Sequence, residues 1–259
     1  MVVAAVSTVV VVGVVGWVVT ASPGWERVKE TFFSWPDAKA ALPDIARGFW
    51  VNVKLFMVAE PVILAVGLVV ALARGTRSAV LFPVRALAVV YVDLFRGVPT
   101  LLLVYLVGFG LPALRLHGVP KSFFWLGVIA LTLSYGAYVA EVIRAGIESV
   151  HPSQRAAARS LGLSQSQTTR HVVLPQALRR VAPPLLNDFV SLQKDTALVA
   201  VLGLTESLRA ANVYGLFQFN YTPYLVAAVF FVALTVPLAR FTDWLGNAAL
   251  ARQHSAGPA

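Results

Sequence analysis

Runs of apolar residues long enough to cross a lipid bilayer occupy most of this chain. A membrane-spanning helix needs roughly 20 mostly apolar residues. Six segments are about that long or longer: residues 2–20, 47–73, 86–111, 123–143, 184–204 and 223–245. Residues 2–20 also have the position of a signal peptide, but no Lys or Arg precedes their apolar stretch, which exceeds the usual core of about 7–15 residues. The pattern predicts an all-α membrane protein of about six transmembrane helices, the first of them retained.

Composition supports the membrane assignment and narrows the chemistry. Of the 259 residues, 58% are hydrophobic and only 13% are charged, which is too apolar for a water-facing surface. The absence of cysteine rules out disulfides, thiolate metal sites and a cysteine nucleophile, and the four histidines have no metal-ligand spacing. Net charge is +9, yet the arginines flank apolar runs instead of forming a stripe interleaved with aromatic residues. They are expected to determine topology and not to bind nucleic acid.

The basic residues are distributed unequally between alternate connections. One side of a six-span arrangement carries Arg74, Arg77, Arg85, Arg144, Arg155, Arg159, Arg170, Arg179, Arg180, Arg240 and Arg252. The opposite connections, 21–46, 112–122 and 205–222, carry fewer, partly offset by acidic residues. Because basic residues favour the cytoplasmic side, both termini and residues 144–183 are predicted to be cytoplasmic. The expected organisation is an additional helix at 1–22, an external amphipathic connection at 23–46, a transmembrane domain at 47–250 with a cytoplasmic loop at 150–180, and a tail at 251–259.

The stretch SQRAAARSLGLSQSQTTRHVVLPQ, residues 153–176, is the longest polar and basic passage in the chain. Pro152 suits a first helical turn, and Gly162 is placed to end that helix. Ser164 with Gln167 three residues later fits a capping box that starts a second helix. Pro175 is expected to end or kink this second helix. The passage therefore predicts a helix, a break and a second helix.

The first of these short helices has an unusual surface. Three consecutive alanines, residues 156–158, leave a face with almost no side chain, so the backbone of another protein can approach it closely. Arg155 and Arg159, one turn apart, would flank that face as anchors for acidic groups. The alternative is a solvated cytoplasmic loop whose arginines only enforce the orientation of the chain.

The spacing of this passage resembles the EAA loop of ATP-binding-cassette importer permeases. That loop has Glu-Ala-Ala, three residues, Gly, nine residues, a β-branched aliphatic residue, one residue and Leu-Pro. Here the pattern falls on residues 156–158, Gly162, Val172, Leu174 and Pro175, with Ala156 where the family usually has Glu. The resemblance implies a coupling helix that docks into a groove on a separate ATPase. The implied contact residues are Arg155, Ala156, Ala157, Ala158, Arg159, Leu161, Gly162, Leu163, Leu174 and Pro175.

Longer strings narrow the resemblance to the polar amino-acid subfamily of these permeases. They are FWVNVKLF (49–56), FRGVPTLLLVY (95–105), YGAYVAEVIRAGIESV (135–150) and VLPQALRRVAPPLLNDFVSLQKDTALV (173–199). The resemblance implies a type I ABC importer permease bundle in a bacterial plasma membrane. It also implies three kinds of protein partner: an ATPase dimer that binds ATP and Mg, a second permease subunit, identical or homologous, and an extracytoplasmic amino-acid-binding protein.

Motifs of catalysis are missing from the sequence. There is no Gly-Lys dipeptide and hence no G-x-x-x-x-G-K-[ST] phosphate loop, and neither G-x-S-x-G nor H-E-x-x-H occurs. The chain is therefore expected to be a transport subunit with no catalytic residue, metal or cofactor of its own. Energy is expected to come from the partner ATPase.

Ionisable residues within the predicted spans indicate a candidate translocation path. A charged side chain inside a membrane costs free energy, and it normally faces the interior of the helix bundle or a water-filled path. Asp93, one turn before Arg96, is expected to neutralise it partly, and RGVP (96–99) interrupts the helix at membrane depth. A zwitterion would meet cations at its carboxylate and anions at its ammonium group. The alternative for each residue is a structural ion pair. The candidates for path or gate are Glu60, Asp93, Arg96, Pro99, Glu141, Arg144, Lys194, Asp195 and Thr196.

Two other classes of protein compete with the importer. An ion- or proton-coupled carrier would use Glu60, Asp93 and Asp195 as relay carboxylates. It gives residues 153–176 no role, and the chain lacks the repeated halves of many carriers. A membrane scaffold would not need charges in the middle of its spans.

Overall fold

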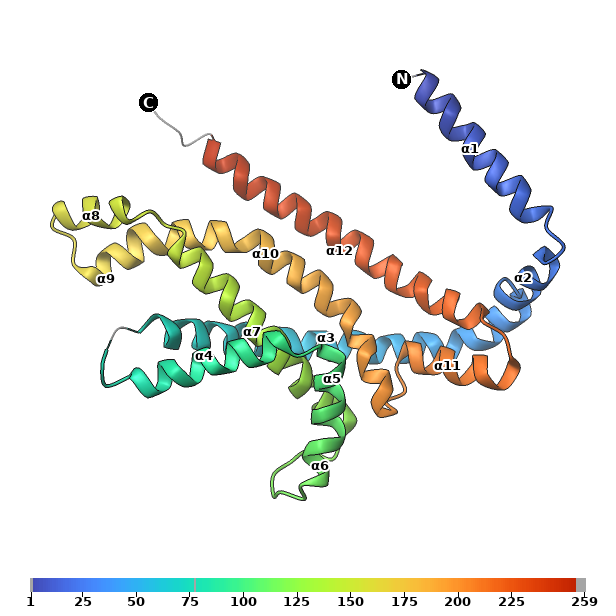
Figure 1. Cartoon of the computed structure of the whole chain (residues 1–259), viewed down its shortest axis with the longest axis horizontal. Coiled ribbons are helices and arrows are strands. Elements are labelled where there is room, and N and C mark those ends of the chain that lie inside the picture. The colour runs from blue at the N-terminus through green and yellow to red at the C-terminus, as the bar shows by residue number, and fades with distance from the viewer. Residues whose placement is uncertain (1, 77, 255–259) are drawn as a thin grey trace.

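The computed structural model describes residues 2–76 and 78–254, and within these residues the regular structure is entirely helical (Figure 1). The α-helices are α1 (Val2–Thr20), α2 (Trp25–Phe32), α3 (Trp35–Gly75), α4 (Phe82–Gly97), α5 (Thr100–Tyr105), α6 (Leu111–Ala113), α7 (Phe123–Glu148), α8 (Pro152–Ser160), α9 (Gln165–Thr168), α10 (Leu174–Asp195), α11 (Ser207–Gln218) and α12 (Thr222–His254). Two π-helical turns, η1 (Leu106–Gly110) and η2 (Thr169–Val173), and one 3₁₀ helix, η3 (Thr196–Leu202), complete the order.

Helix α3 starts earlier than the sequence pattern predicted. The expected external connection ran to residue 46, but α3 begins at Trp35, so only α2 and the residues beside it remain outside the long helix. Ser34 caps α3, with its hydroxyl accepting from the Asp37 amide, and a proline occupies the first turn. The first turns stay helical because Ala41 and Ile45 are buried against α11 and α12.

The core lies along α7, which packs against α3, α4, α5 and α10. Leu126 and Leu131 of α7 are fully buried together with Leu55 and Ile63 of α3. Small residues allow the helices to approach closely, as they do in membrane bundles. A Cβ added at Gly48 of α3 would lie 2.6 Å from the carbonyl carbon of Glu206. The backbone that precedes α11 therefore rests directly on α3.

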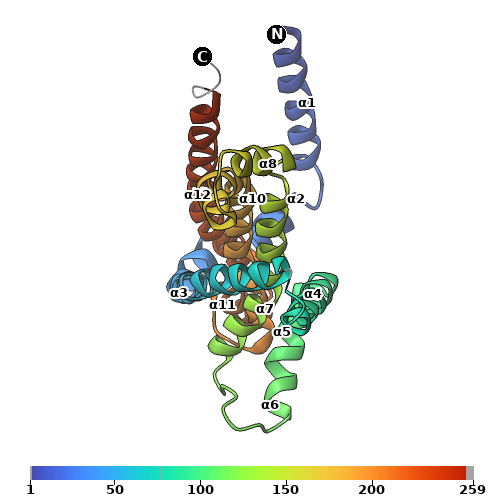
Figure 2. The ribbon, with the colours of Figure 1, turned by 90° about the vertical axis from the view of Figure 1, so that its left-hand side faces the viewer.

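Helix α1 stands apart from the bundle in both views (Figures 1 and 2). Residues 6–20 are all exposed, and the helix contains no ionisable residue. In both figures the beginning of α1, the end of α12 and α8 lie in the upper part, whereas α6 lies at the bottom. The start of α1 and the end of α12 thus lie on the side of the molecule that carries α8.

The structure confirms an all-α membrane protein but changes the outline of the spans. Three helical segments of the described residues are long and apolar enough to cross a membrane alone: Trp25–Gly75, Phe123–Glu148 and Thr222–Gly246. Helices α4 and α5–α6 qualify together as a fourth, bent by 108°. The expected span at 184–204 is not one α-helix, because α10 begins at Leu174, ends at Asp195 and continues as η3.

Candidate coupling segment and translocation path

Local signals in the sequence correctly predicted the shape of residues 152–168. Pro152 lies in the first turn of α8, and Gly162 ends it with φ +85°, in the left-handed region that favours glycine. Ser164 and Gln167 form the predicted capping box, in which the Ser164 amide donates to Gln167 Oε1 at 2.8 Å and the Gln167 amide donates to Ser164 Oγ at 3.3 Å. The helix, break and second helix are confirmed.

Pro175 does not end a helix, as one of its two predicted effects required. The chain widens into the π-helical turn η2 and then enters α10 at Leu174, with Pro175 in its first turn. Proline has no amide hydrogen to donate, and the change from α-helical to π-helical bonding lies directly before it. Residues 165–195 are consequently one continuous helical path from α9 through η2 to the end of α10.

The tip of the α8–α9 turn, defined as residues 156–163, is largely exposed. Ala156 and Ala157 are exposed, and the Leu161 side chain is 82% exposed. A Cβ at Gly162 would meet nothing within 4 Å. Ala158 is buried, so α8 presents two of its three consecutive alanines outward.

The two arginines of α8 were expected to be anchors for acidic groups, and in the structure both donate to backbone carbonyls. Arg155 Nη2 donates to the carbonyl oxygen of Ile147, near the end of α7, at 2.7 Å. Arg159 Nη1 donates to the carbonyl of Leu163 at 3.1 Å, across the turn that follows α8. Arg180 of α10 donates to the carbonyl of Ser149. Arginines from α8 and α10 therefore hold the end of α7.

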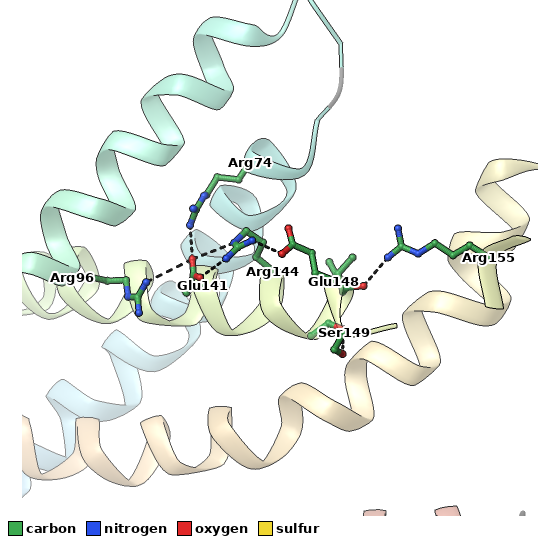
Figure 3. Close-up of polar contacts among 9 residues, drawn as sticks. Arg74, Arg96, Glu141, Arg144, Glu148, Ser149 and Arg155 are labelled. Carbon is green, nitrogen blue, oxygen red and sulfur yellow. Dashed lines mark hydrogen bonds and ion pairs between the residues drawn. The ribbon is translucent and has the colours of Figure 1, made fainter. Parts of the chain in front are cut away.

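Glu141 of α7 is the centre of an ion-pair cluster that links three helices (Figure 3). Its Oε2 accepts from Arg74 Nη1 of α3 at 2.6 Å, and its Oε1 accepts from Arg144 Nη2 at 2.5 Å. Arg96 Nη1 of α4 lies 3.8 Å from the same Oε2. Arg144 also donates to Glu148 one turn further along α7. Sequence spacing identified the Glu141–Arg144 pair but gave no sign that Arg74 would join it.

Arg96 lies at a break in the fourth helical segment, as RGVP predicted. Helix α4 ends at Gly97 and α5 begins at Thr100. The expected neutralisation by Asp93 is not what the structure shows, because Arg96 points to Glu141 while Asp93 is exposed on α4. The Arg96 guanidinium also lies over the Tyr138 ring, 5.7 Å from its centroid. Pro99 caps the start of α5 and is exposed.

Carboxylates gather where α10 passes α3 and α7. Tyr135 of α7 donates from its hydroxyl to Asp195 Oδ2 at 2.8 Å. Asp188, two turns earlier on the same face of α10, has a buried Oδ2 without a hydrogen-bond partner. Glu60 of α3 lines an apolar groove of about 490 Å³ with Phe189 of α10. Sequence reasoning found Glu60 and Asp195 but missed Asp188, which its spacing of seven residues from Asp195 would have placed on the same face.

The other two candidates near the end of α10 differ from this carboxylate group. Lys194 is exposed on the surface of the chain, and Asp195 is the last residue of α10 instead of the middle of a longer helix. Thr196 is fully buried. Its hydroxyl donates to the carbonyl of Gln193 at 2.8 Å, so it supports the turn into η3.

A buried polar network that the sequence did not indicate fixes α11 to α3. Asn52 Nδ2 donates to Glu206 Oε2 at 3.0 Å, and the Ser207 amide donates to Asn52 Oδ1 at 3.1 Å. Glu206, 1% exposed, caps α11 by accepting from the amides of Leu208 and Arg209. Burial raises the pKa of the Glu206 carboxyl, and these backbone hydrogen bonds and that from Asn52 oppose the rise.

Among the described residues there is no group of three or more His, Asp or Glu side chains arranged to hold a metal ion. The side chains described above provide ion pairs, exposed small residues and carboxylates along a helix. They form no nucleophile and base pair of the kind that supports covalent chemistry. The geometry suits the passage of a solute and the docking of a protein.

Comparison with known proteins agrees with this description. The family described as "Binding-protein-dependent transport system inner membrane component" matches residues 64–249. The arginine transport system permease protein ArtQ of Bacillus subtilis is 33% identical over 198 residues, covering 76% of this chain and 88% of ArtQ. The probable glutamine ABC transporter permease protein GlnM of the same organism is 37% identical over 201 residues, covering 76% of this chain and 89% of GlnM.

Solved structures show the same fold. A crystal structure of an amino acid ABC transporter with histidines matches with a TM-score of 0.73 and 31% identity, covering 80% of this chain and 94% of that chain. An inward-facing structure of the MetNI methionine ABC transporter matches with a TM-score of 0.67 at 20% identity, covering 79% of this chain and 95% of that chain. This second match supports the fold alone.

The chain belongs to the family of inner-membrane components of binding-protein-dependent transport systems. It is a multi-pass permease subunit of an ABC importer with the type I fold. This confirms the importer prediction and stands against the ion-coupled carrier and the scaffold.

Proposed function

We propose that this permease subunit imports polar amino acids. The relatives named above are described as arginine and glutamine permeases, and the structure with 31% identity is an amino acid transporter. The partners that this function requires are an ATPase dimer that binds ATP and Mg, an extracytoplasmic amino-acid-binding protein and a second permease subunit. Alternating access would be a rocking of the two permease bundles.

The α8–α9 tip is the proposed docking point for the ATPase. The observation that carries this assignment is the exposure of Ala156, Ala157 and Leu161 around an open Gly162, on a chain that has no phosphate loop of its own. A flat face with one projecting leucine fits a groove. Arg155 ties α8 to the end of α7, and Arg180 ties α10 to Ser149 just after α7. Leu163, Leu174 and Pro175 complete the proposed coupling segment.

The proposed path for the amino acid runs along α10 and the α4–α5 break. Asp188 and Asp195 lie on one face of α10, with Glu60 of α3 near Asp188. This excess of carboxylates favours an amino acid with a basic side chain. Arg96, 41% exposed at the break, is the proposed contact for the substrate carboxylate. Lys194, exposed beside Asp195, is proposed to contact the second permease.

The proposed orientation puts α8 and both ends of the chain in the cytoplasm. The arginines near α8 and in the connection after α3 favour this side, and the start of α1 and the end of α12 lie toward α8 (Figure 2). Residues 114–122 would then be external.

Co-purification tests the proposal. The tagged chain is extracted in mild detergent from its own host and the associated soluble proteins are quantified. We expect an ATPase in stoichiometric amount, and thermal stabilisation of the complex with its binding protein by basic or amide amino acids in preference to apolar ones. A chain that purifies without any ATPase under conditions that preserve its transport activity would contradict the proposal.

A further inference from the structure

The three arginines around Glu141 are not held equally. Arg74 and Arg144 make charge-assisted hydrogen bonds of 2.6 and 2.5 Å with its carboxylate, and their side chains are 13% and 29% exposed. Arg96 approaches only to 3.8 Å and is 41% exposed. Short, shielded, charge-assisted contacts such as those of Arg74 and Arg144 are the strong ones. Glu141 therefore joins α3 and α7 tightly and holds α4 loosely.

The tight part of the cluster continues toward the coupling segment. Arg144 bridges Glu141 to Glu148 along consecutive turns of α7. Directly beside Glu148, the carbonyl of Ile147 accepts the hydrogen bond from Arg155 of α8 (Figure 3). A displacement of α8 therefore pulls on the last turn of α7, the helix that carries Glu141.

The loose part of the cluster ends at the break. Arg96 immediately precedes Gly97, the last residue of α4, and the two halves of this broken helix meet at 108°. Tyr138, one turn before Glu141, faces Arg96 with its ring and donates from its hydroxyl to the Arg96 carbonyl at 3.4 Å. These contacts between Arg96 and α7 thus all come from residues 138–141.

We propose that Glu141 is a positioning residue that transmits movement of the α8–α9 tip to the α4–α5 break. The movement breaks the contact between Arg96 and Glu141. Movement of α7 strains the long Arg96–Glu141 contact before the short contacts to Arg74 and Arg144. Release of Arg96 frees its guanidinium for the substrate carboxylate and lets the break reorient. The inference rests on the proposed function, because it takes a docked ATPase to be the source of the movement.

A thiol placed at the break reports on this movement. The chain has no cysteine, and a Cβ at Gly97 meets nothing within 4 Å, so Gly97→Cys introduces a single label site without a clash. Maleimide labelling is measured on the ATPase-bound complex in nanodiscs, nucleotide-free and trapped with ATP and vanadate. We expect the labelling rate to differ between the two states by about fivefold or more in this parent, and by less than about twofold when Glu141→Gln is added.

Further variants separate positioning from a purely structural role. Arg96→Gln removes only the long contact to Glu141 and is expected to abolish the difference in labelling rate between the two states. This variant keeps the test decisive if Glu141→Gln does not fold. Glu141→Asp keeps the charge and is expected to restore part of the difference. Asp44→Asn removes an i,i+3 ion pair with Arg47, whose side chains are 67% and 78% exposed, and serves as the matched control with an unchanged difference.

Two results would overturn the inference in distinguishable ways. A parent chain that retains no ATPase refutes the proposed function and this inference with it. Either of two results in an ATPase-bound complex refutes this inference alone. The labelling rate of Gly97→Cys changes with nucleotide by the same factor with Glu141 and with Glu141→Gln, or it does not change with nucleotide at all.

Discussion

The hydroxyl of Tyr135 on α7 donates a 2.8 Å hydrogen bond to Oδ2 of Asp195, the last residue of α10. This bond joins two helices at the point where α10 gives way to the 3₁₀ helix η3. It also fixes the orientation of a carboxylate on the proposed substrate path, because Tyr135 is itself buried in the core that α7 forms with neighbouring helices.

Loss of this carboxylate is expected to impair transport of basic amino acids most. Asp195→Asn keeps the shape of the side chain but removes its charge, and Tyr135→Phe removes only the orienting hydrogen bond. We expect the uptake rate to fall by roughly tenfold or more with Asp195→Asn and by a smaller factor with Tyr135→Phe, since hydrogen bonds to charged groups contribute about 1.5–3 kcal/mol. Uptake of radiolabelled arginine and glutamine measures the effect of both substitutions. Lys194→Gln, one residue away and exposed, is expected to lower uptake less than Asp195→Asn does. Equal loss for all three variants would argue against a specific role of this carboxylate.

The α8–α9 tip is predicted to couple ATP hydrolysis to transport. Ala157→Arg places a long charged side chain on the exposed small face, and Gly162→Val forces a β-branched residue into φ +85°, a conformation that costs an L-residue roughly 1–2 kcal/mol. Both variants are expected to insert and fold but to lose stimulation of the ATPase and uptake. ATPase assays with and without loaded binding protein provide the measurement. Stimulation and uptake at the parental level in both variants would remove this tip from the mechanism.

Orientation can be measured directly because the chain contains no cysteine. Gln165→Cys on α9 and His117→Cys in the connection after α6 are both exposed. A membrane-impermeant maleimide applied to intact cells is expected to label position 117 and to leave position 165 unlabelled until the membrane is opened. The reverse pattern would invert the proposed topology.

Gly48 is expected to be among the least replaceable residues of α3. A methyl group there meets the backbone of Glu206 at 2.6 Å, and backbone cannot move aside as a side-chain rotamer can. Gly48→Ala should destabilise the protein by about 1–3 kcal/mol. Gly110→Ala is the control, because its Cβ meets nothing within 4 Å. Apparent melting temperatures in detergent compare the two, and an equal effect would show that α11 does not rest on α3 as described.

The features predicted correctly from the sequence depend on neighbours in the chain. The stop at Gly162, the capping box at Ser164 and the break after Arg96 each require a particular residue type at a local backbone position. The approximate pattern of apolar helices arises from composition, because a lipid-facing helix needs a long apolar run.

The features that were not predictable depend on which distant residues meet. Arg96 has Asp93 one turn away, yet its partner is Glu141 on another helix, where Arg74 from a third helix joins it. Glu206 is capped and buried through Asn52, a residue 154 positions away in the chain. The early start of α3 likewise depends on its packing against α11 and α12. These choices of partner are set by helix packing, which periodicity does not encode.

The most direct test of the importer mechanism is to measure which energy source drives transport by the purified protein in liposomes. The chain is reconstituted with its co-purifying ATPase and binding protein, and uptake of arginine and glutamine is measured with ATP inside, without ATP, and with an imposed proton or sodium gradient. We expect uptake to require internal ATP and the binding protein and to be abolished by Gly162→Val. Uptake driven by an ion gradient in liposomes that contain this chain alone would contradict the importer mechanism.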